Sequence, residues 1–177
     1  FTGRKYVEVI LILPLTIPTY IASYAYYDIL EVLNPIFIWT KNTIGLEGAV
    51  FIENIFVHMV VIFLFSFVLY PYIYLSSRAS LLLEGSKAIE AANMLGVSSD
   101  RLLQKVIIPL IRPAIVAGLS LVVMETLNDY AAVEYFGVST LTIGIFRSWF
   151  GMYDMNAALR LSTFLITFVF LTIALEK

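Results

Sequence analysis

The chain has 177 residues, 60% of them hydrophobic and 14% charged, with a formal net charge of −2. Soluble domains contain about 25% charged residues, so this composition indicates an integral membrane protein rather than a soluble domain. The absence of cysteine excludes disulfides, thiolate nucleophiles and cysteine-based zinc sites, and the single histidine argues against a histidine-built metal centre. We therefore expect neither a cofactor nor a metal site.

Four apolar stretches predict an all-α fold, a polytopic bundle of transmembrane helices. They cover residues 9–27, 55–77, 113–135 and 161–175. A spanning helix needs about 20 residues, so the fourth stretch suffices only if its helix begins near Asn156; otherwise it is cut short. Pro14 and Pro18 predict either a simple kink in the first helix or a helix that packs inside the bundle or lines a cavity. Ala114 and Gly118, four residues apart, favour close approach by another helix.

The basic residues predict the orientation in the membrane. Five of them lie between the second and third stretches, at Arg78, Lys87, Arg101, Lys105 and Arg112. Cytoplasmic loops are enriched in lysine and arginine. We therefore expect this segment and the N-terminus on the cytoplasmic side, and residues 28–53 and 136–158 on the outer side.

Residues 84–109 form a polar island between apolar stretches. Four small or apolar residues of the island fall on one helical stripe, at Ala88, Ala91, Ala92 and Leu95. Gly96 is placed to stop this helix. Three residues that can cap a second helix follow, namely Ser98, Ser99 and Asp100. We expect Pro109 and Pro113 to end the second helix and return the chain to the bilayer, which gives a helical hairpin at the membrane surface.

From the residues alone, this hairpin is either a passive loop or a docking surface for another protein. Small side chains at Ala91 and Ala92 permit close approach by a partner. Glu90 beside them is placed to accept a charge-assisted hydrogen bond from a partner's arginine. We favour the docking surface.

The same segment resembles the signature of ABC-importer permeases. The signature is Glu-Ala-Ala, three residues, Gly, nine residues and then Ile-x-Leu-Pro. "EAANMLG", nine residues and "VIIP" match it at Glu90, Ala91, Ala92, Gly96 and Pro109. Val106 replaces the isoleucine and Ile108 the leucine, and both changes are conservative. The resemblance implies that residues 84–109 are a coupling segment held in a cleft of an ATP-binding subunit, where Glu90 faces that subunit.

Two further stretches, residues 13–30 and 125–154, resemble ferric-iron type permeases; related permeases for thiamine, aminoethylphosphonate or polyamines share parts of them. The resemblance implies one permease domain over residues 1–177, expected to be a fragment or the first half of a tandem chain. It also implies import of iron(III) by alternating access in a prokaryotic inner membrane. The implied partners are an ATPase subunit, an extracytoplasmic binding protein, a second permease domain and the bilayer, with no nucleic acid.

The sequence contains no phosphate-binding Gly-x-x-x-x-Gly-Lys-Ser/Thr loop, so another subunit would hydrolyse ATP, and this chain is not expected to be an enzyme. Two other classes of function remain open from the residues. One is a membrane scaffold whose hairpin recruits a soluble protein, and the other is a proton-coupled carrier.

Three polar residues, Glu125, Asn128 and Asp129, fall at i, i+3 and i+4 of the third apolar stretch, so we expect them to share a face. Ionisable residues within membrane helices are functional candidates because their burial is costly. They are either pathway or gate residues, or structural residues in which Glu125 pairs within the bundle and the other two lie near the outer interface. For direct substrate binding we favour the structural interpretation. His58 is expected to make a structural hydrogen bond.

Overall fold

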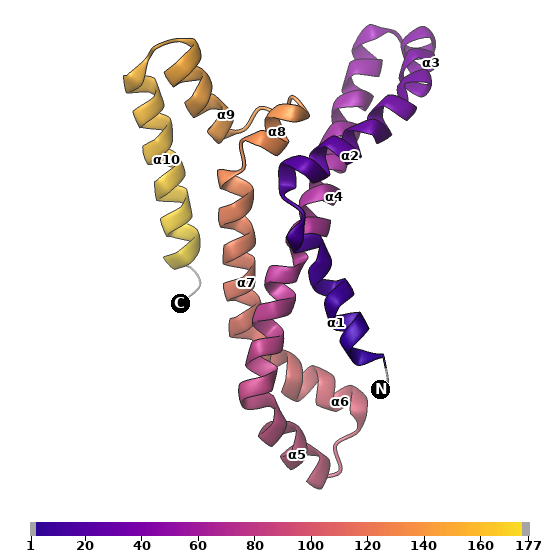
Figure 1. The fold of residues 1–177 in the computed structure, drawn as a ribbon, viewed down its shortest axis with the longest axis vertical. Coiled ribbons are helices and arrows are strands. Elements are labelled where there is room, and N and C mark those ends of the chain that lie inside the picture. The colour runs from indigo at the N-terminus through magenta and orange to yellow at the C-terminus, as the bar shows by residue number, and fades with distance from the viewer. Residues whose placement is uncertain (1–2, 175–177) are drawn as a thin grey trace.

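The computed structural model describes residues 3–174, and all regular elements in this range are helical. Two long helices, α4 (Leu46–Ser80) and α7 (Ile108–Asn128), run side by side through the centre of the molecule. Helices α1 to α3 lie on one side of this pair and α9 and α10 on the other (Figure 1). The prediction of an all-α membrane bundle is confirmed.

The first apolar stretch is broken rather than kinked. Helix α1 (Arg4–Ile12) continues as a 3₁₀ turn (Leu13–Thr16), and α2 (Thr19–Val32) follows after a bend of 89°. A residue before proline avoids the α-helical conformation. Ile17, which precedes Pro18, is accordingly extended, with φ −93° and ψ 116°. Of the two alternatives for the prolines, the simple kink is therefore wrong, because Pro18 starts a new helix in a different direction.

The segment expected outside the membrane, residues 28–53, is mostly helical. Helix α3 (Asn34–Ile44) follows α2 and ends at Gly45, whose positive φ of 85° reverses the chain into α4. Helix α3 packs on the first turns of α4, where the rings of Phe37 and Phe56 are 5.9 Å apart. In α4, Nδ1 of His58 lies 2.6 Å from the carbonyl oxygen of Asn54, the structural hydrogen bond that the sequence predicts.

Helices α4 and α7 are in backbone contact at Gly118. A Cβ atom at this position would lie 2.7 Å from the Cα atom of Ile73. The predicted close approach at Gly118 is thus confirmed, and its partner is α4. Towards α8 and α9, the core is completed by buried residues of α4 and of the segment after α7: Val61, Leu64, Phe65, Val68, Leu69, Ala132, Val133, Phe136 and Ile143.

The third spanning helix ends at Asn128, so the prediction that it reaches residue 135 is wrong. Asp129 is extended, and its Oδ1 atom accepts a hydrogen bond from the backbone N–H of Ala132 at 2.8 Å, which caps the short helix α8 (Ala131–Tyr135). Helix α9 (Leu141–Phe146) and a π turn (Arg147–Gly151) then lead to α10 (Met155–Ala174). Of the two alternatives for the fourth stretch, the earlier start near Asn156 agrees with the structure, in which α10 begins at Met155. Residue 175 lies outside the described residues.

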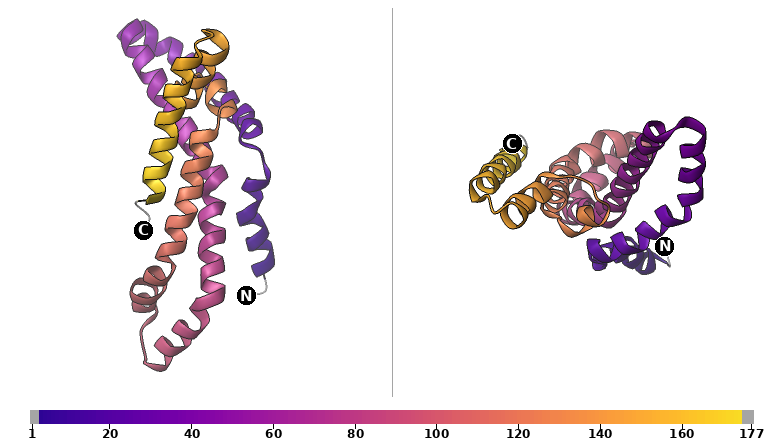
Figure 2. Two further views of the ribbon diagram at one scale, coloured as in Figure 1. Left: turned by 90° about the vertical axis from the view of Figure 1, so that its left-hand side faces the viewer. Right: turned by 90° about the horizontal axis from the view of Figure 1, so that it is seen from above.

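Little of α7 and α10 is buried within the chain, although both are long and apolar enough to cross a membrane. Seen from above, α10 stands beside the bundle rather than inside it (Figure 2). Both helices therefore offer wide apolar faces to lipid or to another membrane protein.

Candidate functional site

The predicted hairpin is present at one end of the molecule, below the paired helices (Figures 1 and 2). Its arms are α5 (Ser86–Met94) and α6 (Ser99–Leu102). A π turn (Leu81–Gly85) joins α4 to α5, and a second π turn (Leu103–Ile107) joins α6 to α7. Helix is therefore continuous over Leu46–Met94 and over Ser99–Asn128, and each arm of the hairpin extends a spanning helix.

The turn of the hairpin is built around Gly96. This residue has φ +70°, a conformation that favours glycine. The N–H of Val97 donates to the carbonyl of Ala92 at 3.1 Å, and the N–H of Gly96 donates to the carbonyl of Asn93 at 3.0 Å. This pair of bonds is the Schellman motif, so the predicted helix stop at Gly96 is confirmed.

The second arm begins and ends differently from the sequence prediction. Ser98 stands at the N-cap, where its carbonyl accepts from the N–H of Leu102 at 2.8 Å, but its side chain makes no capping bond. Pro109 lies in the first turn of α7 and Pro113 inside that helix. The prediction that these prolines end the helix is wrong. Both prolines lie within the helix that is continuous from Ser99 to Asn128, Pro109 directly after the π turn and Pro113 one turn further on, and they are insufficient to stop this long apolar helix.

The signature residues face two ways. Glu90, Ala91, Gly96 and Pro109 are exposed, whereas Ala92 is buried. Helix α5 packs against the π turn of the second arm, and Ala92 is the residue of α5 that is buried. The expected pair of outward-facing alanines is therefore wrong for Ala92.

Two large apolar residues at the tip of the hairpin are almost fully exposed. Met94 is 90% exposed and Leu95 is 82% exposed. The sequence pattern placed Leu95 on one helical stripe with three alanines, and Met94 was not among the predicted site residues. A signal was available, because both residues immediately precede the glycine at which the helix reverses.

The three polar residues at the other end of α7 do not converge. Glu125 Oε1 accepts a hydrogen bond from the hydroxyl of Tyr72 on α4 at 3.3 Å, and Asn128 is exposed at the end of the helix. Asp129 lies beyond the helix and caps α8, so the expected shared face is wrong for this residue. The Thr142 hydroxyl also donates to the carbonyl of Leu127 and fastens α9 to this end of α7.

Two cavities at this end were not predicted. One of about 380 Å³ lies between α4, α7 and the α8–α9 segment and is mainly apolar, with Phe65, Val122 and Thr142 in its walls. The other, of about 310 Å³, is lined by Tyr27, Glu31, Asn34 and Glu53 among others. Between residues 3 and 174, no three side chains of His, Cys, Asp or Glu form a group that could hold a metal ion.

The chain matches one known protein family over almost its whole length. Residues 1–175 match the family described as the binding-protein-dependent transport system inner membrane component. The chain belongs to this family of importer permeases. Neither curated proteins nor solved structures give a match. The permease is therefore a multi-pass membrane protein whose family works with ABC ATPases and substrate-binding proteins.

Proposed function

We propose that this permease is the transmembrane component of an ATP-driven importer. We further propose that its hairpin, residues 84–109, is the surface bound by a separate ATPase subunit. The observation that carries the proposal is the hairpin tip, where two large apolar side chains, Met94 and Leu95, are almost fully exposed. Well-packed apolar anchors surrounded by polar residues dominate the energy of protein interfaces. Glu90, exposed on the same arm, adds a charged group for a partner's arginine.

The helices supply a path from the hairpin to the opposite end of the permease. Each arm continues into α4 or α7, and these two helices are in contact at Gly118 and Ile73. A displacement of the hairpin by the ATPase would therefore move both helices together. The polar pair beside this contact, Glu125 of α7 with Tyr72 of α4, and Asn128 at the end of α7 are our candidates for the gate in an alternating-access cycle.

The remaining partners follow from the exposed surfaces. The poorly buried apolar faces of α7 and α10 suit a second permease domain as well as lipid. Residues 28–53 and 136–158, at the end away from the hairpin, would receive substrate from the binding protein. We place the hairpin and the N-terminus in the cytoplasm because the basic residues gather at that end.

For the substrate we propose iron(III), on the strength of the resemblance of residues 13–30 and 125–154 to ferric-iron type permeases. In such importers the substrate selectivity is determined largely by the binding protein. Uptake of labelled iron, compared with labelled thiamine and aminoethylphosphonate, tests this part of the proposal.

Charge placed at the tip tests the coupling role. We expect Leu95→Glu and Met94→Glu permeases to insert normally but to lose most of the ATPase subunit that co-purifies with the wild type, because an unpaired carboxylate would be buried in the interface. Met152→Glu, at a similarly exposed apolar residue at the other end, is the matched control. Undiminished recovery of the ATPase with both tip variants would refute the docking surface.

A further inference from the structure

A groove lies between α1 and the lower part of α4, next to the hairpin, and the coupling role does not account for it. It encloses a cavity of about 380 Å³. Its walls are formed largely by Val7, Tyr74 and Leu81, and its polar groups are those of Arg4, Glu8, Ser77 and Arg78. The groove is therefore apolar along the helices and charged where the guanidinium groups lie.

The groove contains more positive than negative charge. Glu8 accepts from Nε of Arg4 through Oε1 and pairs with Nη2 of Arg78 through Oε2, both at 2.8 Å. Two guanidinium groups thus share a single carboxylate, which leaves one net positive charge. A guanidinium carries five N–H donors, and the pairing with Glu8 occupies one nitrogen of each arginine. Both arginines are partly exposed, Arg78 at 33% and Arg4 at 66% of the side chain, so they can reach a further anion.

We propose that this groove binds one anionic phospholipid, with the lipid phosphate on Arg4 and Arg78 and the adjoining part of an acyl chain against Val7, Tyr74 and Leu81. Arginine recognises phosphate through paired hydrogen bonds. Basic pockets between transmembrane helices are suited to anionic headgroups. Charge complementarity and the apolar walls together favour a lipid over a soluble anion, which would gain nothing from the walls.

The position of Glu8 predicts the direction in which its removal changes lipid binding. The carboxylate competes with the lipid phosphate for both arginines, so its removal frees donors for the lipid. A purely structural ion triad would behave in the opposite way, because loss of Glu8 would only loosen α1 from α4. Placing the lipid in the cytoplasmic leaflet rests on the orientation proposed above, whereas binding of the lipid does not.

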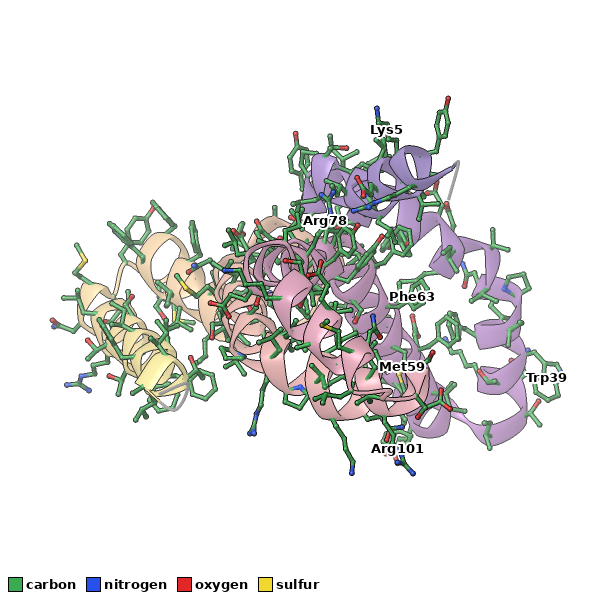
Figure 3. All side chains as sticks on the ribbon, turned by 90° about the horizontal axis from the view of Figure 1, so that it is seen from below. Lys5, Trp39, Met59, Phe63, Arg78 and Arg101 are labelled. Carbon is green, nitrogen blue, oxygen red and sulfur yellow. The ribbon has the colours of Figure 1, made fainter. Side chains whose placement is uncertain are left out.

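The test measures lipids retained by the full permease after extraction from bilayers that contain equal amounts of phosphatidylglycerol and phosphatidylcholine. We expect the wild type to retain phosphatidylglycerol preferentially. Arg4→Gln and Arg78→Gln should each reduce this preference by about fivefold, the effect of one basic residue near a membrane surface. Glu8→Gln should increase it. Arg101→Gln is the matched control, because Arg101 lies on the hairpin and well apart from Arg78, whereas Lys5 and Arg78 lie on the α1 side of the bundle (Figure 3).

Four results would overturn the proposal. The first is equal retention of both lipids by the wild type, which is also expected if a second permease domain fills the groove. The second and third are an equal fall in the phosphatidylglycerol preference for Arg101→Gln and no rise in this preference for Glu8→Gln. The fourth is displacement of the lipid by inorganic phosphate, which would indicate a free-anion site. All are read in detergent, where both ends of the protein are accessible. A wrong orientation or a hairpin that binds no ATPase would therefore leave the lipid result unchanged, and the two failures can be told apart.

Discussion

The contact between α4 and α7 at Gly118 permits a quantitative prediction for Gly118→Ala. The added Cβ would lie 2.7 Å from Cα of Ile73 and 3.2 Å from the carbonyl oxygen of Tyr72. Carbon atoms pack at about 3.5–4.0 Å, so the two helices must separate by roughly 1 Å. Because both clashing atoms belong to the backbone, no side-chain rotation relieves them.

The magnitude follows from two opposing terms. Overpacking of this kind costs about 1–3 kcal/mol. Replacing glycine by alanine inside a helix returns about 1 kcal/mol. We expect a net destabilisation of about 1 kcal/mol, which corresponds to a decrease of about 2–4 °C in the melting temperature of a protein of this size. If the hairpin moves both helices through this contact, substrate uptake should fall as well.

Gly144→Ala is the matched control. A Cβ there would meet only the flexible Cδ1 of Leu161 at 3.5 Å, an ordinary van der Waals distance. This variant should gain the helix-propensity term alone and be slightly more stable than the wild type. Thermal unfolding of the purified permease in detergent compares the two. If Gly118→Ala raised the melting temperature as much as Gly144→Ala, the proposed backbone contact between α4 and α7 would be refuted.

Three further predictions concern the hairpin and the opposite end of α7. Glu90→Ala should leave membrane insertion intact but weaken ATPase binding at least tenfold, since a hydrogen bond to a charged group is worth about 1.5–3 kcal/mol; unchanged co-purification would argue against a role for Glu90. Glu125→Gln should alter substrate uptake without changing ATPase binding, and normal uptake would assign Glu125 to packing. Asp129→Ala should lower stability by about 1 kcal/mol through loss of the α8 cap, measured by thermal unfolding. Asp129→Asn, which keeps an oxygen acceptor, should lose much less, and equal losses would contradict the capping role.

The hairpin could be predicted because its signals are local. Helical spacing of small residues ended at a glycine, and the structure has the corresponding helix with a Schellman turn at Gly96. For the fourth span, the length that a membrane crossing requires gave a start near Asn156 as one of two alternatives, and α10 begins at Met155.

The errors have a common physical origin. Apolar and aromatic residues continue beyond Asp129, at residues 130–133, so the sequence did not reveal that Asp129 ends one helix and caps the next. The prolines were misjudged in both directions, because Pro18 redirects the chain whereas Pro113 is accommodated inside a helix. Whether a proline breaks a helix depends on the packing around it as well as on its own geometry.

Side-chain contacts between residues far apart in the chain could not be predicted from the sequence. Tyr72 and Glu125 are 53 residues apart, and only the packing of α4 on α7 brings them together. The bond between Arg78 and Glu8 likewise depends on α1 folding back along α4. Glu125 was recognisable as a candidate from the sequence, whereas its partner and the groove that Arg78 lines were not.

Site-specific crosslinking tests the central claim most directly. The permease has no cysteine, so Leu95→Cys introduces a single reactive thiol at the hairpin tip, and Met152→Cys introduces one at the opposite end. Each variant would be co-expressed with its ATPase subunit and treated in intact membranes with a short thiol-reactive crosslinker. We predict a permease–ATPase adduct for Leu95→Cys and none for Met152→Cys. Absence of the adduct with Leu95→Cys, or labelling of its thiol from outside the cell by a membrane-impermeant maleimide, would contradict the account.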